Sequence, residues 1–231
     1  MAQPANILNQ NISIKRLHEM RNYGGKILTH GLKEEILKKF ISHDHNLRSA
    51  IESAYENFLA LQKEKPDFLL QTEKEQIKLA QQNIVNFYAN ENVNPYVAIS
   101  AMGPWIVTLK GAVIYDCGGY GMLGLGHSPK LALNEIKKSH VMANVMTPSL
   151  SQMDFIDILK KEIGHSRKNK STFTEFCCLN SGSESVSIGA RLADVNAKEL
   201  TAKGAKHDGK TIARLTLSGS FHGRTDRPAQ F

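Results

Sequence analysis

The chain has 231 residues, and its 41% hydrophobic and 22% charged content is ordinary for a folded globular protein. Its formal net charge is +7, but the basic residues are spread along the chain and no recognised nucleic-acid-binding motif occurs, so we expect no nucleic-acid partner. The chain lacks both an apolar run long enough to cross a membrane and an N-terminal secretory pattern, so we expect no membrane association. Its 3 cysteines do not make a disulfide framework, which favours a reducing, cytoplasmic location.

The N-terminal part of the chain is predicted to be mainly helical. Residues 1–11 are polar and are expected to be loose, and glycines then divide the helical pattern of Ile12–Ile41 into two or three short helices. A longer amphipathic helix is expected to follow a cap at Asp44 or His45 and to end at Pro66.

A capping-box pattern, Thr72-Glu73-Lys74-Glu75, predicts the start of another helix, because the acidic side chain three positions after the threonine can bond back to the cap. This helix is expected to continue to about Asn92. His43 and His45 could ligate a metal, but no cysteine or carboxylate cluster accompanies them, so we expect no metal site.

Beyond the helical region the pattern becomes that of short strands. Trp105–Leu109 and Ala112–Tyr115 are rich in strand formers, and Lys110-Gly111 between them predicts a hairpin turn. Glycines then crowd the stretch from Gly118 to Gly126, which lacks both sequence patterns that are typical of phosphate-binding glycine loops.

Two helices are expected next, at about Pro129–His140 and Ser149–Ile163. We therefore predict three parts in the chain. They are a helical region over residues 1–93, short strands with a glycine-rich segment over 94–128, and the start of a larger α/β domain over 129–231.

One stretch of this last part carries the main functional signal. Strand formers from Phe173 to Leu179 stop at Asn180, small residues follow at Ser181-Gly182-Ser183, and a helical pattern then opens. The free N–H groups and the dipole of a helix N-terminus bind anions, and glycine lets a ligand approach the backbone closely. The alternative is that Ser183 only caps the helix.

A second strand pattern, Thr211–Leu217, ends in Ser218-Gly219-Ser220-Phe221-His222-Gly223-Arg224-Thr225. With a helix from about Ala190 to Lys203 between them, the two strands would form a strand–helix–strand unit of a parallel sheet. Both turns would then lie at the carboxyl ends of their strands, where such sheets bind ligands. One turn would supply hydrogen-bond donors to a phosphate, and the other an aromatic ring and an imidazole. This combination suits a flat, aromatic, phosphorylated cofactor.

Together these motifs resemble the pyridoxal-phosphate-dependent class III aminotransferases, the group of the ornithine, acetylornithine and 4-aminobutyrate aminotransferases. The resemblance rests on Asn180-Ser181-Gly182-Ser183-Glu184 and Phe221-His222-Gly223-Arg224-Thr225, preceded by Tyr115-Asp116-Cys117-Gly118-Gly119 and Gly126-His127-Ser128-Pro129. It covers roughly residues 94–231. It implies an α/β protein of fold type I, whose large α/β/α domain holds a mainly parallel sheet.

The resemblance also implies a cofactor, pyridoxal 5′-phosphate, and roles for five residues. Ser181, Gly182 and Ser183 would hold the cofactor phosphate. Phe221 would stack on the pyridine ring, and His222 would lie beside that ring. From the residues alone, core packing for Phe221 and a backbone-bonded loop histidine for His222 stay open. The implied reaction is transamination between an amino acid or terminal amine and a 2-oxo acid acceptor, in a homodimer.

Two further matches, Glu184 and Arg224, have open roles. Glu184 suits the positive end of a helix without any catalytic part, and Arg224 could steer a substrate carboxylate or pair with an acid. The family's covalent cofactor lysine and its pyridine-pairing aspartate have no counterpart in this sequence, so no catalytic residue is assigned. We therefore expect this chain to be the N-terminal portion of such an enzyme and to be inactive alone. Other interpretations are an aminomutase or decarboxylase of the same fold, or a non-catalytic relative that acts as an interaction protein.

Overall fold

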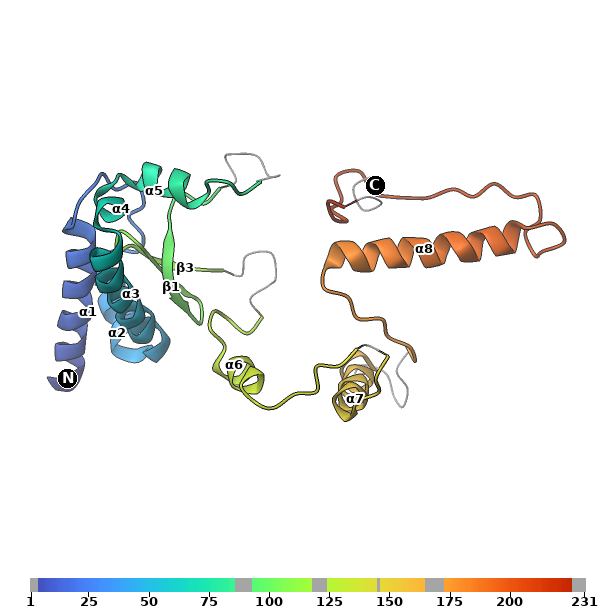
Figure 1. Cartoon of the computed structure of the whole chain (residues 1–231), viewed down its shortest axis with the longest axis horizontal. Helices are drawn as coiled ribbons and strands as arrows, with labels where there is room; N and C mark the ends of the chain where they lie inside the picture. The colour runs from blue at the N-terminus through green and yellow to red at the C-terminus, as the bar shows by residue number, and fades with distance from the viewer. Residues whose placement is uncertain (1–3, 86–92, 118–123, 145, 165–172, 226–231) are drawn as a thin grey trace. The chain divides into compact units, whose positions relative to one another are not determined.

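The computed structural model describes residues 4–85, 93–117, 124–144, 146–164 and 173–225. The chain divides into two compact units, Met1–His140 and Val141–Phe231 (Figure 1), and each is described by itself. The predicted boundaries near residues 93 and 128 stay predictions.

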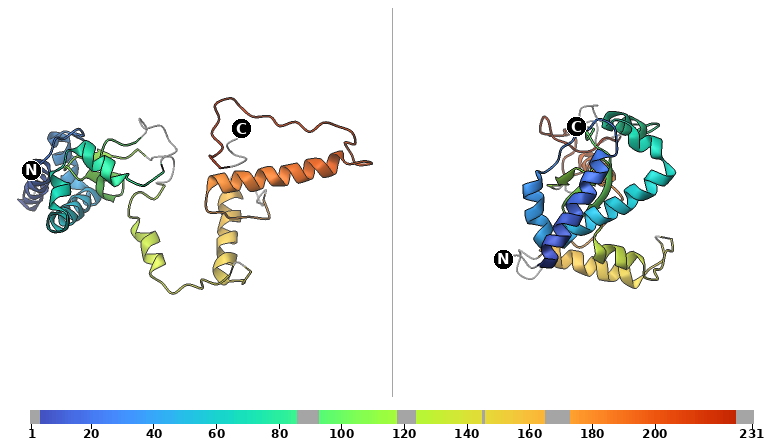
Figure 2. Two further views of the ribbon diagram at one scale, coloured as in Figure 1. Left: turned by 45° about the horizontal axis from the view of Figure 1, so that its top comes forward. Right: turned by 90° about the vertical axis from the view of Figure 1, so that its left-hand side faces the viewer.

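The first unit contains six helices and a small sheet in its described residues. Its helices are α1 (Pro4–Asn22), α2 (Glu34–His43), α3 (His45–Glu64), α4 (Pro66–Leu70), α5 (Glu73–Ala80) and α6 (Lys130–Ile136). The first three gather beside the sheet, as two views show (Figures 1 and 2). The amphipathic spacing of α3 explains its place, because the residues that recur every three or four positions are the ones it buries. They are Leu47, Ala50, Ile51, Ala54 and Phe58.

The sheet is antiparallel, with the strand order β1-β2-β3. Its strands are β1 (Ala98–Met102), β2 (Trp105–Thr108) and β3 (Val113–Tyr115). All of β2 is buried, since it is the central strand and α3 packs across both β2 and β1. The pairing of Trp105 with Tyr115 and of Val107 with Val113 confirms the predicted hairpin.

The turn of this hairpin lies against α1. Gly111 has a φ of 69°, and a Cβ built on it would come within 2.4 Å of the Leu17 carbonyl oxygen. Only glycine fits both the left-handed backbone and this close approach. The turn is closed by bonds from the Gly111 N–H to the Thr108 oxygen (2.9 Å) and from the Thr108 N–H to the Ala112 oxygen (2.8 Å).

The neighbouring Lys110 is a buried cation, only 2% exposed. Its ammonium donates to the carbonyl oxygens of Gly24, Leu69 (2.9 Å) and Gln71 (2.9 Å), so one side chain joins the hairpin to two loops of the helical region. Burial lowers the pKa of Lys110, and the negative charge of Glu73 opposes that shift. Glu73 is itself 1% exposed and accepts the N–H groups of Leu28 (2.6 Å) and Thr29 (2.8 Å).

Asp44 links the helices to the sheet through both oxygens of one carboxylate. Oδ1 accepts from the N–H groups of Asn46 (2.8 Å) and Leu47 (3.3 Å), which caps α3. Oδ2 accepts from the indole Nε1–H of Trp105 at 2.7 Å. Of the two caps predicted for this helix, the structure shows Asp44.

The second unit has two helices, α7 (Leu150–Gly164) and α8 (Gly182–Thr201), in its described part. None of its described residues is buried to the degree seen in the first unit, and its large apolar side chains are exposed or half-buried. After α8 the chain turns and runs back along the helix as an extended segment (Figure 1). The core of the described structure therefore lies in the first unit.

Some predicted boundaries are confirmed and others are wrong. The helix α1 begins at Pro4, so residues 4–11 are not loose, and Pro66 both ends one helix and starts α4, where proline suits the first turn. The capping box at Thr72 is confirmed, with the side-chain and backbone bonds both present. Its helix ends at Ala80 rather than near Asn92, because Asn83 takes a positive φ of 66°; residues 86–92 lie outside the described chain.

The predicted α/β class holds only in its coarse form. The structure combines a helical N-terminal region with a small antiparallel sheet. No parallel strand pair occurs in the residues described. No helix in those residues combines the length and apolarity that a membrane crossing needs.

Replacing Asp44 tests the link between α3 and the sheet. We expect Asp44→Ala to lower the free energy of unfolding by about 2 kcal/mol, because it removes a helix cap and leaves a buried indole N–H without its acceptor. Urea unfolding followed by the fluorescence of Trp105, the chain's 1 tryptophan, measures this loss. The exposed Asp67→Ala is the matched control and should change stability by less than about 0.5 kcal/mol. Equal losses in the two variants would contradict the assigned role.

Replacing Lys110 tests the buried cation. We expect Lys110→Met to cost about 3 kcal/mol, since it leaves the Glu73 charge uncompensated and three carbonyl oxygens without their donor. The same urea titration applies, with the exposed Lys39→Met as control. A Lys110→Met variant as stable as the control would show that the apolar stem of Lys110, rather than its charge, stabilises the turn.

Candidate functional site

The predicted anion turn is the N-terminus of α8. Ser181 is its N-cap, and its Oγ accepts the N–H of Glu184 at 3.2 Å. The same hydroxyl donates to the Glu184 carboxylate at 3.2 Å, so the acidic side chain folds back over the helix start. Glu184 therefore acts here as part of a helix cap, as the helix dipole favours.

The cap leaves Gly182 and Ser183 at the open end of the helix. Their N–H groups have no acceptor among the described residues, as is normal for a first helical turn. A Cβ built on Gly182 would meet nothing within 4 Å. The helix start thus offers two free donors beside open space.

The extended segment after α8 is held against that helix by a charged pair. Arg214 donates from Nη2 to Oδ1 of Asp194 at 2.8 Å. A cavity of about 280 Å³ lies between the segment and the small side chains of the helix, Ala190, Ala193 and Ala197. The segment consequently returns the chain toward the N-terminal end of α8.

This return brings the two motif loops together. The backbone N–H of Arg224 donates to Oγ of Ser183 at 3.4 Å, across 41 residues of sequence. Ser183 is half-buried, in contrast to the exposed Ser181 and Gly182. The interpretation of Ser183 as the helix cap is therefore wrong, since Ser181 fills that place and Ser183 contacts the second loop.

The second loop presents an aromatic ring and an imidazole. Phe221 is 69% exposed as a residue, which excludes core packing as its role in the described structure. The guanidinium carbon of Arg224 lies 5.7 Å from the centroid of this ring. His222 is half-buried, and its Nε2 lies 3.3 Å from Oγ1 of Thr216.

The two flanking strands are not formed as predicted. Phe173–Leu179 and Thr211–Leu217 form neither helix nor strand, and neither pairs in a β ladder within the described chain. The intervening helix also starts earlier, at Gly182 rather than about Ala190. Strand-forming composition sets an extended backbone, but a strand exists only where a neighbour takes up its N–H and C=O groups.

The upstream motif lies in the first unit. Gly118, Gly119 and Gly121 fall outside the described residues. The backbones of Gly103 and His127 exchange two hydrogen bonds, of 2.9 and 2.8 Å. Gly126 has a φ of 73°, and a Cβ there would come 2.9 Å from the Gly103 Cα, so glycine is needed for this approach.

A side-chain contact that the sequence did not indicate ties this motif together. His127 Nε2 lies 3.1 Å from Oδ2 of Asp116, and their side chains are only 24% and 20% exposed. Burial, followed by the charge of Asp116, raises the pKa of the nearby Tyr96. Both members of the pair belong to quoted motif runs, but nothing in their spacing indicates that they meet. Asp116 also lines a cavity of about 560 Å³, together with Tyr115, Cys117 and other residues.

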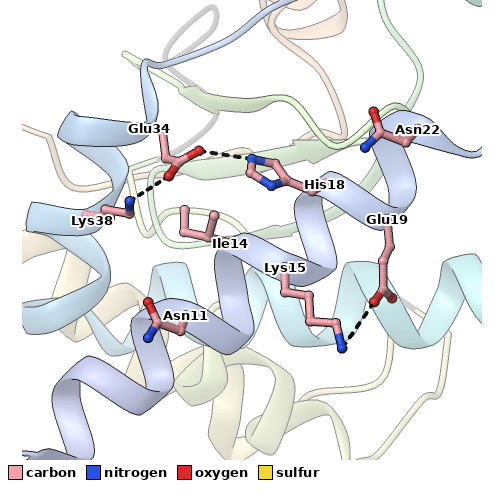
Figure 3. A pocket seen from close by; sticks show the side chains of 8 residues that line it. All are labelled: Asn11, Ile14, Lys15, His18, Glu19, Asn22, Glu34 and Lys38. Atoms are coloured by element: carbon pink, nitrogen blue, oxygen red, sulfur yellow. Dashed lines mark hydrogen bonds and ion pairs between the residues drawn. The ribbon is translucent and has the colours of Figure 1, made fainter.

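A further groove of about 510 Å³ separates α1 and α2 (Figure 3). Across it, Glu34 of α2 contacts His18 of α1 at 2.9 Å, and within α2 the same carboxylate pairs with Lys38 at 2.6 Å. The Lys38 ammonium, helped by His18, holds the pKa of Glu34 below its usual range. These charges satisfy one another at an exposed surface, so the groove indicates helix pairing rather than a ligand site.

No group of three or more His, Cys, Asp and Glu side chains in the described residues is placed to hold a metal ion. No family model, no curated protein and no solved structure matches this chain.

The contact between the two loops can be tested without any ligand. We expect Ser183→Ala to speed amide hydrogen exchange at Arg224 about threefold, because a weak hydrogen bond to an exposed loop contributes less than 1 kcal/mol. Exchange measured by NMR on the whole chain reports this residue alone. Ser185→Ala is the control, since its hydroxyl bonds to the Ser181 oxygen within the helix. An unchanged Arg224 rate in Ser183→Ala would show that the loops do not meet in solution.

Proposed function

We propose that the start of α8 and the loop at Phe221–Arg224 form part of a pyridoxal 5′-phosphate site, in a protein of the class III aminotransferase type. One observation carries this proposal. The Ser183–Arg224 hydrogen bond brings the two resembling motifs, which are 41 residues apart, to one place. A phosphate-binding helix start next to an exposed aromatic ring matches the two ends of this cofactor.

Hydrogen-bond donors of the chain are placed to bind the cofactor phosphate. The N–H groups of Gly182 and Ser183 are free among the described residues, and the space in front of Gly182 is open. The Ser183 hydroxyl adds a donor, because it accepts from Arg224 and keeps its own proton for a phosphate oxygen. The helix dipole favours the negative charge at this point.

The second loop, Phe221–Arg224, would contact the pyridine ring of the cofactor. Phe221 offers an exposed face to a flat heteroaromatic ring, and Arg224 already lies over that side chain. His222, which contacts Thr216, would line the edge of the same ring. When bound, the cofactor supplies an electron sink for bonds at the amino carbon of a substrate. The role of these side chains is to bind and orient it.

The proposed reaction is the transfer of an amino group from an amino acid or terminal amine to a 2-oxo acid. The intact enzyme is proposed to be a homodimer in which Phe173–Leu179 and Thr211–Leu217 belong to a mainly parallel sheet. Support for this comes from the strand-like composition of both segments and from the right order of the motifs along the chain. The aminomutase and decarboxylase alternatives use the same cofactor, so the binding test below does not separate them from transamination.

Gly182→Ala is the sharpest variant for the cofactor proposal. Its added methyl group meets nothing in the chain and suits a helix, so the fold should be unchanged, yet it would stand where a phosphate approaches. We expect it to weaken the binding of pyridoxamine 5′-phosphate about tenfold, or about 1.4 kcal/mol. This probe lacks an aldehyde and does not react with surface lysines. Titration followed by the backbone amide signals at positions 182 and 183 measures the affinity in both proteins.

Two controls accompany this titration. Ser185→Ala should bind like the unmodified chain, and pyridoxamine without its phosphate should bind far more weakly than the phosphorylated probe. Shifts that spread over the surface, or equal binding by Gly182→Ala, would overturn the proposed phosphate site. Failure of the unmodified chain to bind at millimolar probe would instead favour the non-catalytic interaction protein.

A further inference from the structure

A second chemical site lies just before the α8 turn. Cys177 and Cys178 are adjacent in sequence, and both are free thiols on exposed residues. The third cysteine, Cys117, is also exposed but has no cysteine beside it in the sequence. The chain therefore holds one vicinal dithiol and one single thiol.

The backbone around the pair decides whether the two sulfur atoms can reach one ligand. In a β ladder successive side chains point to opposite faces, which would hold adjacent thiols apart. Phe173–Leu179 has no regular secondary structure and pairs with no strand in the part of the chain that the structure describes. Without ladder hydrogen bonds, rotation about the backbone between the two residues can turn both sulfur atoms to one side.

We propose that Cys177 and Cys178 form a chelating site for trivalent arsenicals. Thiolates are soft ligands that favour soft, thiophilic centres, and the second thiol binds at the high effective concentration that the first one creates. With an aryl arsenic oxide, the two thiols give their protons to the oxygen on arsenic and two As–S bonds form. The oxygen leaves as one water molecule. Arsenic stays trivalent, so no oxidant or reductant is consumed.

The position of the pair gives the adduct a consequence. Cys178 is separated from the Ser181 cap of α8 by only Leu179 and Asn180. A small ring closed through arsenic would fix the backbone immediately before this turn. Occupation of the dithiol should therefore change the environment of the Gly182 and Ser183 amides even when no cofactor is present.

The test uses the whole chain, reduced and freed of added thiol, with phenylarsine oxide as the probe. Intact mass should show one phenylarsenic group that survives an excess of a monothiol and is removed by 2,3-dimercaptopropanol. Cys117→Ser should keep this behaviour. Cys177→Ser and Cys178→Ser should each lose monothiol resistance, with affinity lower by about 100-fold or more.

Three outcomes would overturn the proposal. They are no adduct that resists the monothiol, an adduct that Cys117→Ser abolishes, and an adduct that survives in either single variant of the pair. The arsenical site needs no cofactor, but it does need Phe173–Leu179 to be unpaired, as it is in the described chain. In the sheet of the proposed enzyme the two thiols would point to opposite faces, so the adduct is expected of this chain with the segment unpaired. Failure of the dithiol would leave pyridoxamine 5′-phosphate binding to Gly182 and Ser183 intact, and failure of the cofactor site would leave the monothiol-resistant adduct.

Discussion

The Asp44 carboxylate is the contact on which the first unit depends. One of its oxygens caps α3 and the other accepts the indole proton of Trp105 in the central strand. The same residue thus sets where the longest core helix begins and how that helix meets the sheet. The apolar face of α3 can then cover β1 and β2, because its start and its distance from Trp105 are both set. Burial of this face supplies the main stabilisation.

Buried polar groups set the rest of that unit. Lys110 and Glu73 are each almost fully enclosed, and each is bonded mainly to backbone groups of the loops around it. Such groups stabilise a fold only when their partners are correctly placed, so they select one arrangement of the loops among several that would bury similar apolar area. Gly111 also helps to select this arrangement, since it lets the hairpin turn contact α1.

The second unit is held together differently. It has no buried apolar core in its described residues, and its main links are polar. Asp194 holds the returning segment through Arg214, and Ser183 accepts from the backbone of Arg224. An ion pair and a hydrogen bond therefore help to bring together the two loops that resemble cofactor motifs. A ligand that contacts both loops would add stability where the chain itself supplies little.

Local pattern was sufficient wherever a few neighbouring residues decide the structure. The amphipathic spacing of α3, the Thr72 capping box, the Lys110-Gly111 turn and the helix after Ser181 could all be predicted, because each depends on contacts within a few positions. In the candidate site, the sequence identified the loops but not their contact.

Only the tertiary structure decided the features that join distant residues. Ser181 rather than Ser183 is the cap, Asp116 meets His127, and Asp44 binds Trp105 61 positions away. Phe173–Leu179 and Thr211–Leu217 have strand-forming sequences, yet neither forms a ladder in the described chain. The reason is physical. A helix turn satisfies its own backbone hydrogen bonds, whereas a strand, a contact between distant side chains or a two-loop site needs a partner whose position no local pattern encodes.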